Sequence, residues 1–305
     1  GGNVAPVGGS GILHWQSGGA SGQVAMIDSL VGMEGTFPSF ECGAEVDWYI
    51  SVESVEGDLV YSPYNAPAEA WQSEAWSGVE VSFEDDFNSD QGWTVVAGAG
   101  TGNWQRATPA GSGGGRCDNP SDSDGSGLCY VTGNGTDEDL DDGTTILTSP
   151  AMDASEGGTL RYDRWYNNGS NCGGADPLND IFVVEVSDDG ATWVDLETVG
   201  PGGSEVNGGW ISKAWDVEAI PGLTPSSTFY VRFTASDLND GSIVEAAVDA
   251  VLIDRYYCND EPCPGDITGD GQVNVDDLLA AVAGFGVDYT VEDILDILAV
   301  FNSPC

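Results

Sequence analysis

Short runs in which apolar and polar residues alternate dominate most of the chain. Four such runs lie in the first 61 residues and seven lie between residues 144 and 254, and turns rich in Gly and Pro separate them. Alternation with a period of two is the pattern of a half-buried β-strand, and this spacing of turns is typical of all-β domains. The predicted strands are 12–15, 23–27, 46–52, 59–61, 144–148, 159–166, 181–187, 192–199, 210–217, 228–235 and 244–254. A helical period first appears at residue 275, so we expect a mainly β chain with a small α-helical end.

Changes in this pattern divide the chain into four segments. A Gly-rich N-terminal segment covers residues 1–11, a first β domain with an exit linker covers 12–82, and a larger β block covers 83–257. A helical module covers 258–305. A chain of 305 residues is long enough for two or three domains with cores of their own. A Gly-rich end is ordinarily mobile, so if it is ordered we expect something to hold it.

A loop with calcium-binding chemistry opens the helical module, at residues 266–277. Side-chain oxygen falls at positions 1, 3, 5, 9 and 12, the carbonyl of Gln272 falls at position 7, and Gly271 at position 6 permits the sharp bend. Hard oxygen ligands at this spacing suit Ca²⁺, and a helix-forming run follows at once. The predicted ligands are Asp266, Thr268, Asp270, Gln272, Asn274 and Asp277. A solvated acidic turn would not account for the glycine, Val273 and the helix together.

The module from Cys258 to Cys305 resembles a dockerin, in particular the C-terminal dockerin-like anchors of secreted planctomycete-type bacterial proteins. The resemblance rests on the loop and on two helical runs, Asp277-Leu278-Leu279 with Val282 and Phe285, and Asp293-Ile294-Leu295 with Leu298 and Phe301. Dockerins usually carry two loop–helix repeats, each with a calcium ion, whereas the second loop here is shortened to 286–290. The resemblance therefore implies one calcium loop, a degenerate second half and docking onto a partner. The symmetric two-way docking of the family would need the missing repeat.

The two β segments also resemble known families. Residues 12–82 resemble small immunoglobulin-like domains of secreted bacterial hydrolases, through His14-Trp15, Met26, Phe37-Pro38, Cys42-Gly43 and Trp48-Tyr49-Ile50. Residues 83–257 resemble MAM-like and carbohydrate-binding-module-like jelly rolls of secreted bacterial proteins, through 83–87, Gly92-Trp93, Trp104, 124–127, 186–193 and Val248-Asp249. The fold class we expect is therefore mainly β, with an immunoglobulin-like sandwich, a larger jelly-roll β-sandwich and a small α-helical calcium-binding module.

The jelly-roll resemblance implies a structural calcium ion where the first strand meets the last. Glu84, Asp86 and Asp249 occupy the matching positions, and a carboxylate inside the last strand would be costly if it were buried without a partner. The alternative is that all three are ordinary solvent-facing acids. A nearby acidic loop is either a further ion site or, as we favour, a solvated turn; its members are Asp118, Asp122 and Asp124.

Aromatic residues of the larger β block are candidates for a surface on which sugar rings stack. Exposed Trp and Tyr serve this purpose in carbohydrate-binding modules, whereas large aromatic residues in general fill cores or interfaces. The candidates are Trp93, Trp104, Trp165, Tyr166 and Trp210. The pattern leaves both alternatives open and favours the core.

Charge and cysteine content restrict the class of protein. Lys and Arg number 7 against 51 Asp and Glu, giving a net charge of −44, and this excludes the basic patch that nucleic acids or anionic lipids require. No apolar run approaches the roughly 20 residues that span a bilayer. Seven cysteines indicate an oxidising, extracellular compartment, with Cys263–Cys305 and Cys117–Cys129 as candidate disulfides and no choice among the other three. Residue 1 is Gly rather than Met, so we expect a removed leader or a longer precursor.

Motifs for catalysis are scarce. His14 is the only histidine, and it lies in a predicted strand without a nucleophile motif nearby. The sequence has no HExxH, P-loop or dinucleotide fingerprint, and among 51 acids no pair suited to a glycosidase can be singled out. We therefore expect a protein that is not an enzyme.

Two non-catalytic functions remain. The first is a calcium-stabilised extracellular structural protein, whose copies join head-to-tail into a fibre or surface layer through the N-terminal segment, a sandwich edge or the dockerin-like end. The alternative is the glycan-binding and anchoring accessory region of a secreted bacterial hydrolase or protease. The partners we expect are other copies of the chain, a cell-surface or extracellular protein, or a glycan, and neither nucleic acid nor a membrane interior.

Overall fold

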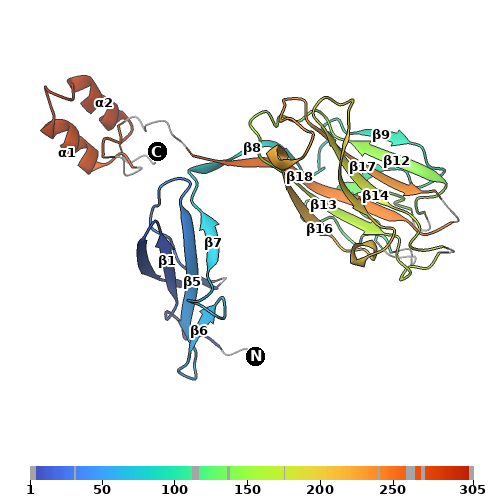
Figure 1. Cartoon of the computed structure of the whole chain (residues 1–305), viewed down its shortest axis with the longest axis horizontal. Coiled ribbons are helices and arrows are strands. Elements are labelled where there is room, and N and C mark those ends of the chain that lie inside the picture. The colour runs from blue at the N-terminus through green and yellow to red at the C-terminus, as the bar shows by residue number, and fades with distance from the viewer. Residues whose placement is uncertain are drawn as a thin grey trace. The chain divides into compact units, whose positions relative to one another are not determined.

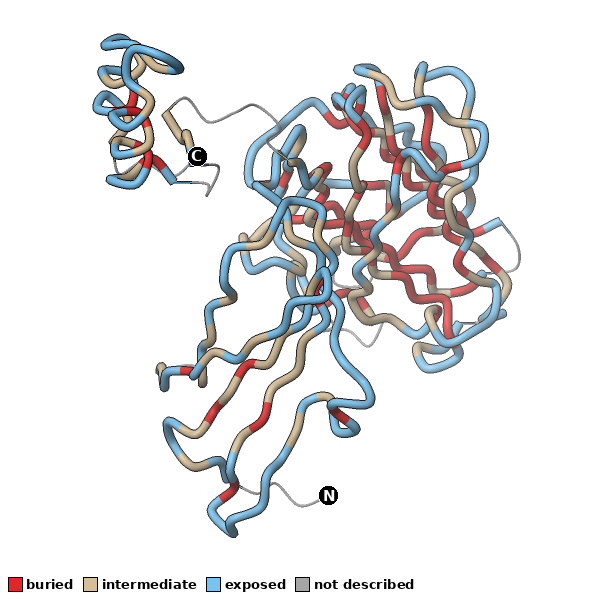
Figure 2. Tube along the Cα trace, turned by 60° about the vertical axis from the view of Figure 1, so that its left-hand side comes forward, coloured by how far each residue is buried: buried red, intermediate tan, exposed pale blue. Residues whose placement is uncertain are grey.

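A computed structural model of the 305-residue chain describes residues 5–30, 32–111, 117–135, 138–174, 176–238, 241–258, 265–268 and 272–301. The chain forms two compact units, one from Gly1–Gly78 with Tyr257–Cys305 and the other from Val79–Tyr256. Strands dominate and the two described α-helices lie near the C-terminus, which confirms the mainly β fold class (Figure 1). Most buried residues belong to the larger unit (Figure 2).

The N-terminal β domain is a five-stranded antiparallel sheet with a short hairpin. The sheet order is β2-β1-β5-β6, and β7 also pairs with β5. The strands are β1 (Ile12–Ser17), β2 (Ala20–Ala25), β5 (Glu45–Glu53), β6 (Leu59–Ser62) and β7 (Trp71–Glu74), and the hairpin joins β3 (Ile27–Ser29) to β4 (Gly32–Glu34). Gly18 and Gly19, with φ of 54° and 86°, form the two-residue turn from β1 to β2, a conformation that glycine adopts without steric cost. The described residues of this domain include no second full sheet, so the immunoglobulin-like likeness stays a prediction.

Alternation along β1 and β5 gives this sheet two different faces. On one face Trp15 and Trp48 lie directly opposite each other and contact Phe40 and Phe37, with ring centroids 5.2 and 5.8 Å apart respectively. Leu13, on the same face, is 3% exposed. This face is the core of the domain, and the other face carries the polar and ring side chains of a groove.

The described part of the Gly-rich segment is held by its own domain. The N–H of Val7 donates to the carbonyl of Glu53 (2.8 Å), and the N–H of Val55 donates to the carbonyl of Ala5 (3.1 Å). Residues 1–4 lie outside the described residues. We expected something to hold the Gly-rich segment if it is ordered, and for its described residues the holding contacts come from the same chain.

The predicted exit linker, from Pro63 to about Ser82, contains one strand and the start of another. Residues 71–74 form β7, and residues 78–85 form β8 (Gly78–Asp85), which pairs with β18 (Glu245–Tyr257). All four residues of β7 are exposed, so no apolar alternation marks this strand in the sequence. Backbone pairing with β5, rather than burial of side chains, defines it.

The larger unit is a β-sandwich of two antiparallel sheets. One sheet has the order β10-β11-β18-β13-β16 with β8 also on β18, and the other has the order β15-β14-β17-β12-β9. All seven strands predicted between residues 144 and 254 are present. The elements are β9 (Thr94–Ala97), β10 (Gln105–Ala107), β11 (Cys129–Val131), β12 (Gly143–Thr148), β13 (Thr159–Asn167), β14 (Phe182–Ser187), β15 (Val194–Val199), β16 (Ile211–Asp216) and β17 (Tyr230–Asp237), with short 3-10 turns η1 (Ser204–Val206) and η2 (Val217–Ala219).

A continuous hydrophobic core lies between the two sheets, drawn in red in Figure 2. Phe233 of β17 is central, since its ring packs against those of Tyr162 and Phe182, with centroids 5.2 and 6.3 Å away. Burial of large apolar side chains supplies most of the favourable free energy of such a fold. Other fully buried members are Leu147, Leu160, Val184, Val186, Phe229, Val231 and Val248.

The C-terminal module is a pair of short helices, α1 (Val275–Ala283) and α2 (Val291–Ala299). Each begins with a capping box, formed by Asn274 with Asp277 and by Thr290 with Asp293, which satisfies backbone N–H groups of the first turn. Neither described helix is long and apolar enough to cross a membrane. The small core of the module consists of Val273, Ala281 and Ile297.

Two disulfides join distant parts of the sequence, Cys42–Cys258 and Cys117–Cys172. The predicted bridge between Cys117 and Cys129 is therefore wrong. Cys129 is fully buried in β11, and its burial raises the pKa of the thiol. The residue is a small apolar member of the sandwich rather than half of a bridge. The predicted Cys263–Cys305 bridge lies outside the described residues and stays a prediction.

We expect peptide mapping under non-reducing conditions to link Cys117 to Cys172, with Cys129 protected from thiol reagents until the chain unfolds. Replacing Cys117 and Cys172 by Ala should lower the free energy of unfolding by about 4 kcal/mol, because the bridge constrains a 55-residue loop in the unfolded state. Urea denaturation measures this change. Recovery of a Cys117–Cys129 peptide would contradict the pairing.

Candidate functional site

The predicted C-terminal calcium loop brings three oxygen-bearing side chains together. The Thr268 hydroxyl donates to Asp277 Oδ1 (2.9 Å) and lies 3.4 Å from Asp266 Oδ1. The first, third and twelfth positions of the predicted loop therefore converge. Three of the predicted loop residues, Gly269, Asp270 and Gly271, lie outside the described residues.

Asp277 is the buried centre of this loop. Burial alone would raise its pKa, but N–H groups of Asn274 (2.8 Å) and Thr268 (2.9 Å), with the Thr268 hydroxyl, outweigh burial and lower the pKa to about 2. Each carboxylate oxygen can accept more than one bond, so the ionised group keeps capacity for a metal. An ionised carboxylate beside Asp266 and Thr268 is an oxygen donor set that fits Ca²⁺, and the ion would tie the two ends of the loop together.

A second acidic cluster lies on the larger sandwich. Asp122, Asp124 and Asp249 offer oxygen atoms that all lie within 4.8 Å of one another. Asp249, within β18, is fully buried and accepts the N–H of Ser123 (2.7 Å). Burial raises the pKa of Asp249 to about 7, the Ser123 N–H opposes this, and Asp124 adds to it. Because the pKa is about 4 in an unfolded chain, this group destabilises the fold as pH rises from about 4 to about 7, unless a cation takes the place of the proton.

The predicted partners of Asp249 are not the ones the structure brings to it. Glu84 and Asp86 are exposed and are not members of the cluster. The Asp86 carboxylate instead accepts the N–H (2.9 Å) and the side-chain amide (2.8 Å) of Asn88. The loop that does reach Asp249 is the acidic one that the sequence analysis interpreted as a solvated turn.

Most of the aromatic candidates for a sugar-binding surface lie in the core, the alternative that the sequence pattern favoured. Trp93 and Trp104 are 8% and 4% exposed, so no sugar can stack on them. Trp165 and Trp210 are half-buried and pack edge-to-face on each other, with centroids 6.0 Å apart. Tyr166 is fully buried. The sequence could not separate these residues from exposed ones, because the core and a binding surface both favour large rings.

A groove that the sequence analysis did not find lies on the polar face of the N-terminal sheet. Its volume is about 540 Å³. The residues that line it come from three strands, β1, β2 and β5, and from the segment before β7, which contributes Pro67 and Ala70. The polar and ring side chains of the lining include His14, Gln16, Ser21, Gln23, Asp47 and Tyr49. The sequence indicates a shared face only for residues two apart in one strand, such as His14 and Gln16.

Ring and polar side chains form two parallel rows in this groove. His14 and Tyr49 lie directly opposite each other, and their rings stack at 4.3 Å with an interplanar angle of 7°. Gln16 and Asp47 form the next pair along the same two strands. Asp47 Oδ1 accepts the amide of Gln72 (3.0 Å) from β7, which fixes the carboxylate. A ligand in the groove would meet rings on one side and hydrogen-bonding groups on the other.

His14 also makes the one contact in the groove that resembles a catalytic pair. Its Nε2 lies 2.7 Å from the hydroxyl of Ser51. Ser51 is 4% exposed, however, so a ligand cannot reach this hydroxyl. Burial lowers the pKa of His14, so the imidazole is neutral at pH 7. The contact orients the ring and is not arranged for nucleophilic attack.

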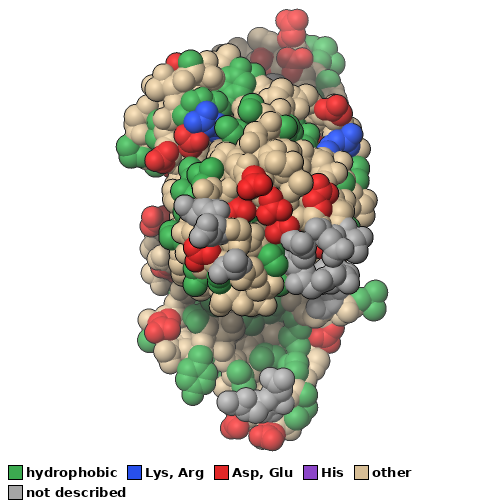
Figure 3. Space-filling view, turned by 90° about the vertical axis from the view of Figure 1, so that its right-hand side faces the viewer, with side chains coloured by type: hydrophobic (Ala, Val, Ile, Leu, Met, Phe, Trp, Pro, Cys, Tyr) green, Lys and Arg blue, Asp and Glu red, His purple; other side chains and the backbone are tan. Residues whose placement is uncertain are grey.

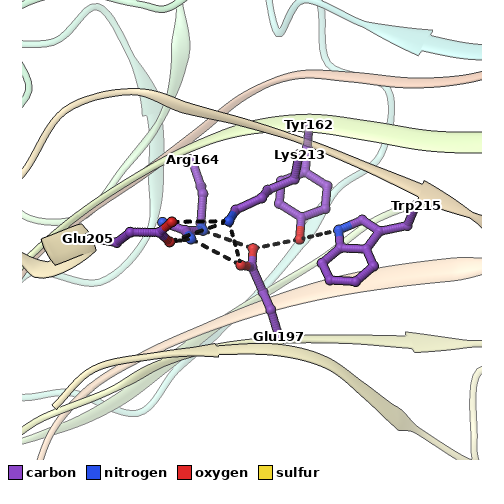
Figure 4. A network of polar contacts seen from close by, with 6 residues as sticks. All are labelled: Tyr162, Arg164, Glu197, Glu205, Lys213 and Trp215. Atoms are coloured by element: carbon purple, nitrogen blue, oxygen red, sulfur yellow. Dashed lines mark hydrogen bonds and ion pairs between the residues drawn. The ribbon is translucent and has the colours of Figure 1, made fainter. Parts of the chain in front are cut away.

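A buried ionic network joins the two sheets of the larger sandwich (Figure 4). Arg164 of β13 is fully buried and binds Glu197 of β15 through two bonds of 2.8 and 3.0 Å. Glu205 contacts the same guanidinium, Lys213 lies 3.5 Å from Glu197, and the Tyr162 hydroxyl donates to Glu197 (2.7 Å). Every charge in the network faces an opposite one, so the arrangement stabilises the sandwich rather than offering a reactive group.

Acidic side chains recur over the surface and basic ones are few, as one face shows in Figure 3. The described ion pairs engage Arg161, Arg164, Lys213, Arg232 and Arg255. Arg106 donates to the carbonyl of Phe87 (2.9 Å), and Arg116 lies outside the described residues. The described surface therefore has no basic patch for phosphate groups.

Comparison with known proteins gives structural likenesses only. No protein-family model matches the chain, and no curated protein matches it. The chain is similar to the K3 and K1 cleaved adhesin domains of Lys-gingipain from Porphyromonas gingivalis W83, at 18% and 17% identity over 58% of this chain and 99% and 98% of those domains, each with a TM-score of 0.35. It is also similar to a family 11 carbohydrate-binding module from Clostridium thermocellum, solved with a mixed-linked tetrasaccharide, at 16% identity over 58% of this chain and 95% of the module, with a TM-score of 0.30. Likeness at this level carries no argument about the function of this chain.

Removing Arg164 should destabilise the sandwich strongly. We expect Arg164→Met to lower the free energy of unfolding by about 3–5 kcal/mol, because Glu197, whose side chain is 11% exposed, would lose both bonds to the guanidinium and keep only the more distant Lys213 as a basic partner. Arg255→Met is a matched control, since the side chains of Arg255 and Glu80 are 33% and 54% exposed. That exposed pair should contribute at most about 1 kcal/mol. Equal losses in urea denaturation would contradict the role of the buried network.

Calcium should order the C-terminal module through Asp277. We expect helix α1 to be protected from hydrogen exchange in calcium and less protected in EDTA, because metal binding and folding of such a loop are coupled. Asp277→Asn should abolish the difference, whereas Asp276→Asn, the same change at the exposed neighbouring position, should retain it. Protection that is equal in EDTA and calcium would show that the capping boxes and the small core suffice.

Proposed function

We propose that the chain is a non-catalytic extracellular protein that binds glycans and is anchored through its C-terminal helical module. The observation that carries the proposal is the groove of the N-terminal sheet. It combines the stacked rings of His14 and Tyr49 with the fixed carboxylate of Asp47 and the amide of Gln16.

The lining of the groove matches the chemistry of a sugar. A pyranose has apolar C–H faces that pack on aromatic rings and hydroxyl groups that bond to amides and carboxylates. Asp47 is held by Gln72 in a fixed position, so it can accept a hydroxyl without first losing side-chain freedom. His14 is neutral at pH 7, because burial lowers its pKa, and the only charge in the lining is the negative one of Asp47. These groups favour a neutral glycan over an acidic one.

The anchor is the part of the proposal that involves calcium. Asp266, Thr268 and Asp277 converge in a loop that precedes a capped helix, and this arrangement supports a Ca²⁺-dependent module. A module that orders only with calcium would be folded outside the cell, where calcium is plentiful. The two disulfides fit the same compartment.

Assembly of copies into a fibre has less support from the described residues. Head-to-tail joining through the Gly-rich segment would need that segment to be available to a neighbouring copy. Val7 and Val55 instead connect it to its own domain through backbone hydrogen bonds. Glycan binding is therefore the function that we put forward.

Binding to an array of neutral oligosaccharides in millimolar calcium tests this function. We expect Tyr49→Ala to weaken binding of a glycan identified on the array by at least about tenfold, which corresponds to about 1.4 kcal/mol. Asp47→Asn should weaken it by a smaller factor, because the amide oxygen still accepts one hydroxyl. Calorimetry with the purified full chain supplies the dissociation constants.

Tyr64→Ala is the matched control, since Tyr64 is 88% exposed and does not line the groove. It should leave the affinity unchanged. If no glycan binds, or if Tyr49→Ala and Tyr64→Ala behave alike, the groove is not the binding site. Circular dichroism of each variant separates lost binding from lost fold.

A further inference from the structure

Two buried carboxylates meet where strands β14 and β17 end. Phe182 lies opposite Ala235 in the ladder, and beyond this pair the N–H of Leu238, next to Asp237, donates to the carboxylate of Asp180. Asp180 and Asp237 therefore lie close together at this end of the two strands. Asp180 and Asp237 are each 3% exposed. Like charges in this position repel each other, and burying them is costly unless something compensates.

Hydrogen bonds from the protein compensate one of the two groups. Asp180 accepts the N–H of Leu238 on one oxygen and the hydroxyl of Ser242 on the other, both at 2.9 Å. Asp237 Oδ1 is buried and has no hydrogen-bond partner among the described residues. Asp180 is thus fixed, while Asp237 retains an oxygen available to a ligand.

Tyr166 gives a second, independent indication of a ligand at this place. Its side chain is fully buried, and its hydroxyl has no hydrogen-bond partner in the part of the chain that the structure describes. Tyr166 lies beside Asp180, because both residues border Gly200: a Cβ added to Gly200 would lie 2.6 Å from the carbonyl oxygen of Asp180 and 3.5 Å from the Tyr166 ring. Buried polar groups without partners are rare in folded proteins, and each calls for a specific explanation.

No described basic side chain can neutralise this pair. The five Arg and Lys side chains in described ion pairs contact other carboxylates, and Arg106 donates to a backbone carbonyl. More negative charge lies close by, because β12 starts beside Asp237, with Gly143 as its ladder partner, and Asp139 just before that strand is 2% exposed. The described basic side chains therefore leave the neutralisation of this pair to a bound cation or to a shared proton.

We propose that Asp180 and Asp237 bind a divalent cation of the calcium type, at a site bordered by the Tyr166 hydroxyl. Carboxylate oxygens are the ligands that Ca²⁺ prefers, and a shared cation turns the repulsion between the two groups into a bridge between β14 and β17. The site shares no residue with the C-terminal loop or with the cluster at Asp249. It is also independent of glycan binding in the groove.

The number of calcium ions bound per chain tests the proposal. The full-length chain is freed of metal with EDTA, dialysed against calcium chloride and analysed for bound metal by mass spectrometry. We expect Asp237→Asn to lower the number by one. Asp216→Asn is the matched control at the end of β16, where the carboxylate accepts the N–H of Glu218 in a short turn, and it should leave the number unchanged.

The amide of Asn also separates the proposal from its main alternative, a proton shared by the two carboxyl groups. Asn has nearly the shape of a protonated carboxyl, so under that alternative Asp237→Asn keeps the full number of calcium ions. An unchanged number of calcium ions per chain would overturn the proposal. The number would also stay unchanged if water alone occupied the site. Asp180→Asn is the second variant, should the first fail to fold, and the same loss of one ion is expected from it.

Discussion

A large excess of negative charge, with few basic side chains to balance it, is the constraint on which the rest of this structure depends. The chain has 51 acidic and 7 basic side chains. A carboxylate removed from water costs several kcal/mol unless it is paired, hydrogen-bonded or protonated. Where a base is present it pairs with a carboxylate, and in one case the base is fully buried, as with Arg164, which binds Glu197. Where no base is present, backbone N–H groups donate hydrogen bonds to the carboxylate, as at Asp277, or burial raises the pKa of the carboxyl group, as at Asp249.

The same constraint relates the fold to the environment in which the protein would work. A surface rich in carboxylates repels phosphates and acidic sugars but attracts divalent cations. The groove is the exception on this surface, because Asp47 is its one acid among neutral rings and amides. Under the proposals above, calcium would adjust the stability of the scaffold, while recognition would rely mainly on uncharged groups and one carboxylate, that of Asp47. The two tasks fall on different parts of the chain, so one can be altered without the other.

Local patterns in the sequence predicted local structure well and long-range structure poorly. Strands such as β14 and β17, which bury alternate residues, were found from alternation, whereas β7 and β9 were missed because all their residues are exposed. The predicted calcium loop is contiguous in sequence, so a ligand set could be proposed from the sequence, and that set stays a prediction. The groove could not, since His14 and Tyr49 meet only through pairing of β1 with β5. Cys117 was paired with its nearer neighbour in sequence, but burial of that neighbour in β11 left Cys172 as its partner.

The bridge between Cys42 and Cys258 has a mechanical consequence. These residues are 216 positions apart in sequence and are joined by a single covalent bond. A ligand held in the groove and an anchor at α1 and α2 would pull on the chain from the two sides of that bond. Tension would then pass directly from one sulfur to the other, and the sandwich of Val79–Tyr256 would carry none of it. Reduction of the bond would place the sandwich in the path of the force, so the redox state of one cystine would decide which domain resists stretching.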